Sequence, residues 1–407
     1  MANEPFMDRW TLNGTEVLLQ DHGRDQANGV PILDNEAKLP MRYIPETYAQ
    51  NLKVSPDDPF NMDFTEWVAT LISPEYQNAG KMLLQELDST NSGSFGAIAA
   101  NDSICIAIGL NSSSPGIYWS EDGKHWTLSD NTTAYHANRN AILYANNVWV
   151  IATQTEGVLY STDGKHWHTT DLSGILTTYP TYGNGVWNVG TSTGTYWSED
   201  LDHWTQSDLT VNIYALDYYN GVWFAGQANG RNLYTSTNGK NWTQKLYVNG
   251  AIVVYVKHVH DYWYATFLGS SSVPKYSSDN GETWSDLGGF ASGDNFTSVD
   301  YANNIYTACG SYVYRSTTGG THWSGGFSIG ASSYNQAICY NGLYLIMANN
   351  GAYWSTDAGI PYTKCVNSQN VQLEYNFKCA AVFKNMLILG SDSHGLWYSG
   401  ENIWLPS

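Results

Sequence analysis

The segment Tyr118-Trp-Ser-Glu-Asp-Gly-Lys-His-Trp126 recurs along the chain, and its repetition decides the fold. Close copies are Leu159-Tyr-Ser-Thr-Asp-Gly-Lys-His-Trp167 and Tyr196-Trp-Ser-Glu-Asp-Leu-Asp-His-Trp204. Further copies lie at Tyr234–Trp242, Tyr276–Trp284, Tyr314–Trp323, Tyr353–Tyr362 and Trp397–Trp404, of which the last two are weaker. The first serine of each copy gives a spacing of 37 to 44 residues: Ser120, Ser161, Ser198, Ser236, Ser277, Ser316, Ser355 and Ser399. The chain therefore contains eight copies of one unit.

An apolar hairpin precedes each of these segments. Four examples have Asn-Gly or Asn-Asn at their centre: Ile142–Ile151, Tyr182–Trp187, Tyr218–Phe224 and Cys339–Leu345. Such pairs tolerate the positive φ of a type I′ turn, which joins two antiparallel strands. The first copy, Phe95–Gly109, turns at Asn101-Asp102, and the last, Lys378–Gly390, turns at Lys384-Asn385. Each unit thus supplies an inner hairpin and an outer hairpin.

Four antiparallel strands without a helix, repeated eight times, predict an all-β fold. Single sheets of this kind cannot bury their faces, and radial stacking buries them while leaving only short edges. The spacing is close to the period of a propeller blade, about 40–45 residues. We therefore predict an eight-bladed β-propeller of four-stranded blades over residues 94–407, or seven blades if one terminal copy is displaced. Residues 1–93 would form an extended segment with short helices.

The charge of the chain excludes several classes of partner. Its 407 residues carry a formal net charge of −19. An acidic surface repels phosphate backbones and anionic lipid, so we expect no nucleic-acid partner. No apolar run approaches the ~20 residues that span a bilayer, so we expect no membrane insertion. The start of the chain lacks the apolar core of a signal peptide, which predicts synthesis in a cytoplasm without standard export.

The sequence predicts no cofactor and no metal site. The five cysteines are spread out, and four lie in apolar strand patterns typical of small buried side chains. A histidine precedes the tryptophan in four of the repeated segments. Because a residue repeated at one rotational position is a framework feature, we expect no metal at these histidines: His125, His166, His203 and His322.

The repeated segments resemble the Asp-box, also called the BNR repeat, with the pattern Ser-x-Asp-x-Gly-x-Thr-Trp. Ser277–Trp284 matches it in full, and the other copies are shortened or substituted. Short Ser and Asp side chains accept hydrogen bonds from the amides of their own turn, and a Trp can cover that turn. The resemblance implies structural corners without chemistry, formed by Ser120, Asp122, Trp126, Ser161, Asp163, Trp167, Ser198, Asp200, Trp204, Ser277, Asp279 and Trp284.

Asp-box propellers include sialidases and other glycosidases, so an enzymatic function has to be weighed. Resemblance to a sialidase implies three convergent arginines, a Tyr–Glu pair and an Asp. The propeller region holds Arg139, Arg231 and Arg315, and Arg315 directly precedes a corner serine, far from the axis. We therefore expect no convergent triad. Another glycosidase needs two carboxylates about 5–10 Å apart, and nothing in the sequence pairs Glu156, Asp294 and Glu374.

Residues 1–93 contain no repeat. Trp10–Asp21 has the pattern of a β-hairpin around Asn13-Gly14. Gly29-Val-Pro-Ile-Leu-Asp-Asn-Glu-Ala-Lys-Leu-Pro-Met-Arg-Tyr-Ile-Pro45 is similar to the connector of phage tail fibres, from which it departs at Ala37, where that family has glycine. Apolar residues at helical spacing predict short helices over 63–72 and 79–87, and 89–94 reads as a hinge.

These features favour a phage tail receptor-binding protein. The resemblance implies a virion protein, a homotrimer, and attachment to other tail proteins through residues 1–93. The propeller would bind a bacterial surface glycan or protein receptor, with aromatic rings stacking on sugars and amides bonding hydroxyls. Candidate residues lie in loops that precede each innermost strand or join the second and third strands: Tyr135, Asn138, Arg139, Tyr179, Asn229, Arg231, Asn232, Phe290, Tyr334 and Tyr375.

Two alternatives remain open. A tail-borne glycosidase or depolymerase would cleave a host polysaccharide and release new reducing ends. A purely structural tail component would bind no host cell.

Overall fold

A computed structural model describes residues 9–12, 15–18, 84–87, 93–109, 116–130, 142–153, 157–172, 177–228, 230–249, 251–269, 272–340, 343–359, 361–367 and 371–399. The chain divides into two compact units, Met1–Gly80 and Lys81–Ser407. In the first, β1 (Arg9–Leu12) and β2 (Thr15–Leu18) pair antiparallel, with Leu12 opposite Thr15. The hairpin predicted around Asn13-Gly14 is confirmed. The connector over 29–45 and the helix over 63–72 lie outside the described residues.

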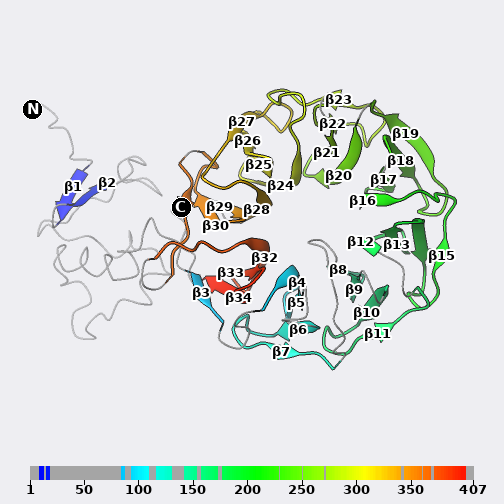
Figure 1. Ribbon diagram of the computed structural model, residues 1–407, viewed down its shortest axis with the longest axis horizontal. Coiled ribbons are helices and arrows are strands. Elements are labelled where there is room, and N and C mark those ends of the chain that lie inside the picture. The colour runs from blue at the N-terminus through cyan, green and yellow to red at the C-terminus, as the bar shows by residue number, and fades with distance from the viewer. Residues whose placement is uncertain are drawn as a thin grey trace, which may run out of the picture. The chain divides into compact units, whose positions relative to one another are not determined.

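The second unit is a ring of eight four-stranded antiparallel sheets, an eight-bladed β-propeller (Figure 1). In seven blades the strands follow one another from the axis outward in chain order. The first four blades are β4 (Phe95–Ala100), β5 (Cys105–Gly109), β6 (Ile117–Ser120), β7 (Thr127–Leu128); β8 (Ile142–Ala145), β9 (Val148–Ala152), β10 (Val158–Ser161), β11 (His168–Thr169); β12 (Thr177–Gly183), β13 (Val186–Thr191), β14 (Gly194–Ser198), β15 (Thr205–Gln206); and β16 (Ile213–Tyr219), β17 (Val222–Gln227), β18 (Asn232–Ser236), β19 (Thr243–Tyr247).

The next three blades repeat this order. They are β20 (Ile252–Val259), β21 (Tyr262–Leu268), β22 (Lys275–Ser277), β23 (Ser285–Asp286); β24 (Phe296–Ala302), β25 (Ile305–Gly310), β26 (Val313–Ser316), β27 (Ser324–Phe327); and β28 (Tyr334–Tyr340), β29 (Leu343–Ala348), β30 (Gly351–Ser355), β31 (Thr363–Lys364). The predicted fold class and blade number are therefore confirmed. None of the described residues forms a helix long and apolar enough to cross a membrane.

The eighth blade takes its outermost strand from the other end of the unit. It consists of β32 (Phe377–Phe383), β33 (Met386–Ser391), β34 (Leu396–Ser399) and β3 (Leu84–Glu86), with Leu84 opposite Ser399. The prediction of a helix over 79–87 is wrong for Leu84–Glu86, which form a strand. These residues pair with the open edge of β34. Leu84 is fully buried in the core of this blade. The propeller unit thus includes residues ahead of Ser94.

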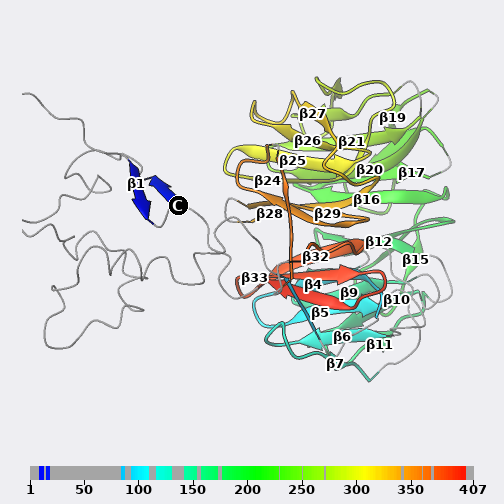
Figure 2. The same ribbon diagram turned by 60° about the vertical axis from the view of Figure 1, so that its left-hand side comes forward.

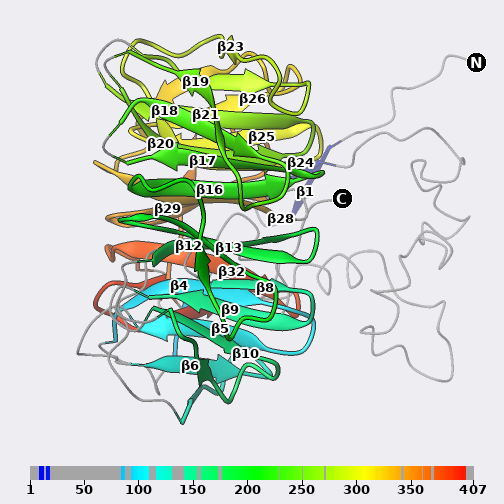
Figure 3. The ribbon, with the colours of Figure 1, turned by 90° about the vertical axis from the view of Figure 1, so that its right-hand side faces the viewer.

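Hydrophobic cores lie between neighbouring blades. The contact that closes the ring joins β4 of the first blade to β32 and β33 of the eighth. Phe95 and Cys105 there share one buried cluster with Cys379 and Met386. Figures 2 and 3 show the blades edge-on, with their strands running across the thickness of the ring. Each sheet therefore buries its two faces against its neighbours, as radial stacking requires.

The inner hairpins turn as predicted. Asn184 and Gly185 have φ of 48° and 79°, and Asn303 and Asn304 have φ of 48° and 62°, the left-handed values of a type I′ turn. Lys384 and Asn385 follow the same form, with φ of 46° and 62°. Asn101 differs, because its Oδ1 accepts hydrogen bonds from the amides of Ser103 and Ile104, both at 2.9 Å. That first turn is held by a side chain instead.

The strand order gives the ring two distinct faces. One face carries the inner-hairpin turns and the repeated Ser-x-Asp segments, and we call it the turn face. The opposite face carries the loops from second to third strand and the links between blades, and we call it the loop face.

In seven blades the innermost strand has a register shift at its loop-face end, as between Ile213 and Ala215. Such bulges re-aim side chains at sheet ends.

Candidate functional site

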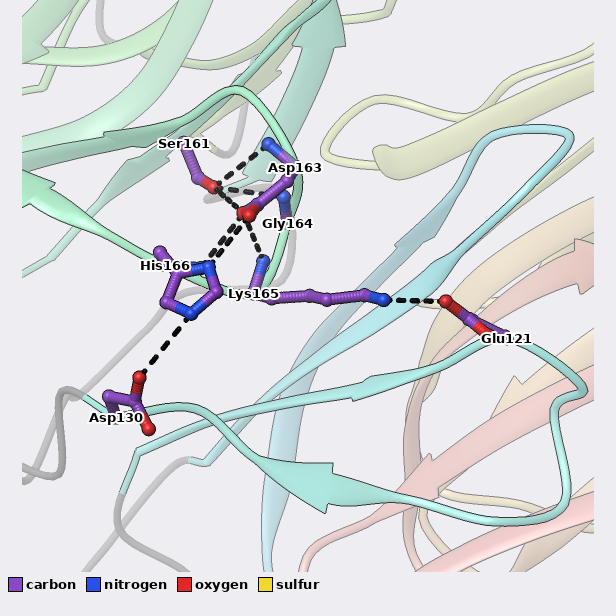
Figure 4. A network of polar contacts seen from close by, with 7 residues as sticks. All are labelled: Glu121, Asp130, Ser161, Asp163, Gly164, Lys165 and His166. Atoms are coloured by element: carbon purple, nitrogen blue, oxygen red, sulfur yellow. Dashed lines mark hydrogen bonds and ion pairs between the residues drawn. The ribbon is translucent and has the colours of Figure 1, made fainter.

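Each repeated Ser-x-Asp segment forms a self-contained turn, which we call a Ser–Asp corner. Figure 4 shows the corner of the second blade. Ser161 Oγ accepts from the amide of Gly164 at 2.8 Å and donates to Asp163 Oδ1 at 3.0 Å. Asp163 Oδ1 also accepts from the amides of Lys165 and His166, at 2.8 and 2.9 Å. The polar atoms of the corner are thus occupied by their own turn.

The other predicted corners repeat this geometry. Ser120 and Ser198 donate to Asp122 and Asp200 at 3.0 and 3.1 Å. Ser277 donates to Asp279 at 2.7 Å, and Thr283 Oγ1 donates to the other oxygen of that carboxylate. Trp126 and Trp204 donate to the carbonyls of Gly123 and Leu201 in their own turns. Trp167 is buried, and Trp284 packs edge-on against Phe224 of the preceding blade.

Three of the four corner histidines contact the aspartate of their own corner: His125, His166 and His203. His166 Nδ1 lies 2.7 Å from Asp163 Oδ2, and its Nε2 lies 3.5 Å from Asp130 (Figure 4). Burial pulls the pKa of Asp163 upward, but the hydrogen bonds from His166, Lys165 and Ser161 together lower it. The hydrogen bond to Asp163 raises the pKa of His166. Among the residues that the structure describes, no group of three or more potential ligands could hold a metal ion.

Neighbouring corners are joined along the rim of the ring. Lys165 Nζ pairs with Glu121 of the first blade at 2.5 Å and lies over the ring of Trp119 at 4.4 Å. Lys240 repeats this in the fourth blade, with Glu199 at 2.6 Å and Trp197 at 3.9 Å. Between these two pairs, Tyr160 donates to Asp202 of the next blade at 2.7 Å. The rim residues therefore serve blade-to-blade contacts.

The innermost strands carry a second set of links. Asp217 on β16 accepts from the amide of His258 on β20, and Asp300 on β24 accepts from the amide of Cys339 on β28, both at 2.8 Å. Gln336 on β28 both accepts from and donates to the backbone of Ala380. An innermost strand has an unpaired edge, and a side chain of the preceding blade satisfies it. Burial raises the pKa of Asp217 and of Asp300, against the charge of Lys257.

The structure describes the side chains of only five of the ten predicted binding residues. Tyr135, Asn138, Arg139 and Asn229 lie outside the described residues. Tyr179 lies in the irregular stretch of β12 between Thr177 and Pro180, and its side chain is also outside the described part. The other five are Arg231, Asn232, Phe290, Tyr334 and Tyr375, and the structure brings only the first two together.

Three of these aromatic residues contribute mainly to packing. Tyr334 is only 3% exposed, and its hydroxyl bonds the backbone of Ile329 and Ala331. Phe290 packs on Tyr314, with ring centroids 4.4 Å apart. Tyr375 stacks on His394, with centroids 3.9 Å apart. A buried Tyr334 cannot contact a receptor, so we leave it out of the candidate site.

Arg231 and Asn232 belong to one cluster at the loop-face end of the fourth blade. Arg231 Nη1 donates to the hydroxyl of Tyr247 at 3.0 Å and to Asn249 Oδ1 at 2.9 Å. Tyr247 ends β19 and pairs with Asn232, which begins β18. Tyr247 is 54% exposed although its hydroxyl accepts a hydrogen bond from Arg231. We call Tyr214, Arg231, Asn232, Tyr247 and Asn249 the blade-4 cluster.

The inner part of the blade-4 cluster lies toward the axis. Asn232 Nδ2 donates to Gln227 Oε1 at 2.9 Å and to the hydroxyl of Tyr234 at 3.1 Å. Gln227 on β17 pairs with Ile213 on β16. Tyr214, which follows Ile213, is the bulged residue of β16. Tyr214 is 49% exposed. The cluster therefore extends along the blade from an exposed tyrosine near the axis to a second one near the rim.

Exposed large apolar side chains gather on the loop face. The described part of the chain has seven of them: Leu128, Tyr214, Tyr219, Tyr247, Leu268, Tyr312 and Val371. By their positions in the strand order, five of the seven lie at the loop-face ends of the fourth to seventh blades, Tyr219 lies on the turn face, and Leu128 ends an outermost strand. Tyr214 and Tyr247 were not among the predicted binding residues, because both belong to strands, where an aromatic residue is usually buried.

The two described arginines of the propeller do not converge on one site. Arg231 lies in the blade-4 cluster, while Arg315 Nη1 donates to the carbonyl of Asp357 in the next corner at 3.3 Å and lies 3.9 Å from its carboxylate.

The two described carboxylates that were considered for a glycosidase have separate partners. Glu374 pairs with Lys364 at 2.5 Å, and Asp294 accepts from the amide of Ala291 at 2.9 Å.

Comparison with known proteins supports the fold alone. No family model matches the chain, and no curated protein matches it. Among solved structures, the computationally designed protein Ika8 aligns with 13% identity over 78% of this chain and 100% of its own, with a TM-score of 0.58. BamB from Moraxella catarrhalis aligns with 11% identity over 80% and 99%, with a TM-score of 0.56. YCF48 bound to D1 peptide aligns with 15% identity over 78% and 95%, with a TM-score of 0.50. At these identities the likeness extends to the architecture of the ring.

Proposed function

We propose that this chain is a phage tail receptor-binding protein whose propeller binds a bacterial surface glycan through its loop face. The observation that carries the proposal is the gathering of exposed tyrosines and polar side chains at that face, with Tyr247 fixed by Arg231. Exposed aromatic rings stack on the C–H faces of sugars, and amide and guanidinium groups bond sugar hydroxyls. Residues 1–93, with their tail-fibre-like connector, would attach the chain to the tail.

In the same proposal the Ser–Asp corners are Asp-boxes. Their carboxylates accept hydrogen bonds from their own turns, and their tryptophans cover those turns. The innermost carboxylates Asp217 and Asp300 cap the strand edges of the next blade. Carboxylates committed to such contacts have a structural role at both places, which supports receptor binding over catalysis as the function.

The proposal is tested by adding the labelled full chain to a panel of bacterial strains and to mutants of each strain that lack capsule or lipopolysaccharide sugars. We expect saturable binding to some strains, loss of binding with the missing glycan, and protection of bound cells from phage infection. Absence of binding to every strain would favour a structural tail component. Release of new reducing ends from the purified polysaccharide would identify a depolymerase instead.

A further inference from the structure

We propose that Arg231 and Tyr247 form a subsite for an anionic sugar, whose carboxylate or phosphate is bound by the guanidinium while its ring packs on the tyrosine. This inference rests on the proposed function of the loop face. It adds the chemical class of the ligand and the two residues that recognise it.

The charge of Arg231 is the first argument. Its Nη1 donates to two neutral oxygens, those of Tyr247 and Asn249. Within the described part of the chain no carboxylate lies at salt-bridge distance from it, whereas Arg315 faces Asp357. The chain has 37 acidic residues against 18 basic ones, so an exposed arginine that avoids every described acid is unusual. A guanidinium held by neutral acceptors keeps its full attraction for an anion.

The donor geometry of Arg231 is the second argument. A guanidinium has five N–H donors in a planar fork that matches carboxylate and phosphate oxygens. The two bonds to Tyr247 and Asn249 both use Nη1. Nη2 and Nε donate to no described residue, which leaves one edge of the fork for two parallel bonds to an anion. Charge-assisted pairs of this kind are among the strongest hydrogen bonds in proteins.

The rigidity of the pair is the third argument. The carbonyl of Arg231 accepts from the amide of Val248 at 2.9 Å, and Tyr247 pairs with Asn232 in the β18–β19 ladder. Both residues are therefore anchored by the sheet, and the hydrogen bond between their side chains orients the ring of Tyr247, a residue that is 54% exposed. A site that is ordered before binding avoids the entropic cost of ordering it with the ligand. Stacking area and charge thus lie side by side in a preformed arrangement.

The experiment uses the full chain and polysaccharide fragments from a strain that it binds. The fragments are offered untreated, after carbodiimide–borohydride reduction of their carboxylates to alcohols, and after removal of their phosphates with hydrogen fluoride. The variants are Arg231→Gln, Arg231→Lys and Tyr247→Phe, with Lys245→Gln as the matched control. Lys245 lies on β19, the strand that ends with Tyr247. Lys245→Gln removes one positive charge, as Arg231→Gln does, but the ammonium of Lys245 is already paired with Glu282 at 2.8 Å.

We expect one of the two treatments to lower the affinity of the fragments for the wild-type chain at least tenfold. That treatment identifies the anion as a carboxylate or a phosphate. Arg231→Gln should lose about as much and become insensitive to that treatment. Arg231→Lys should retain part of the affinity as a point charge, and Tyr247→Phe should lose part of it because the fork is no longer oriented. Lys245→Gln should bind as the wild-type chain does, and unchanged melting temperatures should show that all variants are folded.

Two results would overturn the inference. If the chain binds untreated, carboxyl-reduced and dephosphorylated fragments equally, the ligand is a neutral sugar. If Arg231→Gln and Lys245→Gln lose affinity to the same extent, only net charge matters and the subsite does not exist. In both cases the chain still binds a glycan, so the proposed function stands. Absence of binding to every strain contradicts the proposed function itself.

Discussion

Asp300 on the innermost strand of the sixth blade accepts a hydrogen bond from the backbone amide of Cys339 in the seventh blade, with 2.8 Å between Oδ2 and N. Asp217 makes the same contact to His258 between the fourth and fifth blades. Each carboxylate closes the open edge of the next innermost strand, where a buried amide would otherwise lack a partner. These links join neighbouring sheets at the axis, and the rim ion pairs join them at the perimeter.

Replacing Asp300 tests the axial link. Asp300→Ala leaves the amide of Cys339 unpaired and should lower the free energy of unfolding by about 1–3 kcal/mol. Asp300→Asn keeps an acceptor oxygen and should lose less. Because burial raises the folded-state pKa of Asp300, its charged form is disfavoured in the fold, and its contribution to stability should fall as pH rises from its unfolded value of about 4 through the folded value. Urea denaturation at several pH values measures both effects.

The control for Asp300 is Asp102→Ala, at an exposed position in the first inner turn. It should change the free energy of unfolding by no more than about 0.5 kcal/mol. Equal stability of Asp300→Ala and Asp102→Ala at about pH 4, where the contribution of Asp300 is largest, would show that the axial hydrogen bond carries no weight.

The serine of a corner should matter more than its exposed neighbour. Ser161 is fully buried and its hydroxyl bonds Gly164 and Asp163, so Ser161→Ala should cost about 1–3 kcal/mol. Thr162→Ala removes the side chain of the next, exposed residue and should be nearly neutral. Chemical denaturation of the two variants gives the comparison, and similar costs for both would contradict the structural role of the serine.

The corner of the third blade predicts a dependence on pH. Backbone and side-chain hydrogen bonds from His203 lower the pKa of Asp200 to about 2, and the side-chain bond to Asp200 raises the pKa of His203. The stability from Asp200 is present above pH 4 and is lost as pH falls toward 2. The stability from His203 is present below pH 6.5 and is lost as pH rises through its folded value. The pair therefore stabilises most between about pH 4 and pH 6.5.

The measurement is the melting temperature of wild type and Asp200→Asn from pH 2 to pH 8. The difference should be largest near pH 5 and smaller at both ends of the range. Asn238→Ala is the control, because Asn238 occupies the same corner position without a titratable group and bonds Ser236, Lys240 and Asn241. A difference for Asp200→Asn that is constant with pH, like that of the control, would contradict the assignment.

The eighth blade takes its outermost strand, β3, from the start of the propeller unit. Leu84 of β3 is fully buried in the core between the seventh and eighth blades, so Leu84→Ala should lower the free energy of unfolding by about 2–5 kcal/mol. Leu128 ends an outermost strand with 39% exposure, and Leu128→Ala should cost about 0.5 kcal/mol or less. If Leu84→Ala unfolds at the same denaturant concentration as Leu128→Ala, β3 does not stabilise the eighth blade.

The sequence allowed the blades to be predicted because their signals are local. Asn184-Gly185 marks a turn wherever it occurs, and the Ser–Asp corner repeats within each unit. β3 could not be predicted, because it has three residues and its partner β34 lies at the far end of the chain. Its own spacing of leucines suggested a helix, and only the open edge of the last blade makes it a strand.

The candidate site was predicted only in part, for a different reason. Arg231 and Asn232 were found because polar residues in a second-to-third-strand loop indicate exposure. The exposed and buried tyrosines of β16 could not be told apart in the same way, since Tyr214 and Tyr219 are exposed while Tyr218 packs on Trp223. Both sides of an innermost strand pack against neighbouring blades, so the alternation that reveals an exposed residue is weak there.

Which face binds is tested most directly by two tyrosines on opposite faces of the ring. Tyr247 is 54% exposed on the loop face, and Tyr219 is 45% exposed on the turn face, where it stacks on His258. The binding of Tyr247→Ala and Tyr219→Ala to a receptive bacterial strain should be measured beside the wild-type chain. We expect at least a tenfold loss of affinity for Tyr247→Ala and wild-type affinity for Tyr219→Ala. Loss confined to Tyr219→Ala would place the receptor on the turn face and contradict the account.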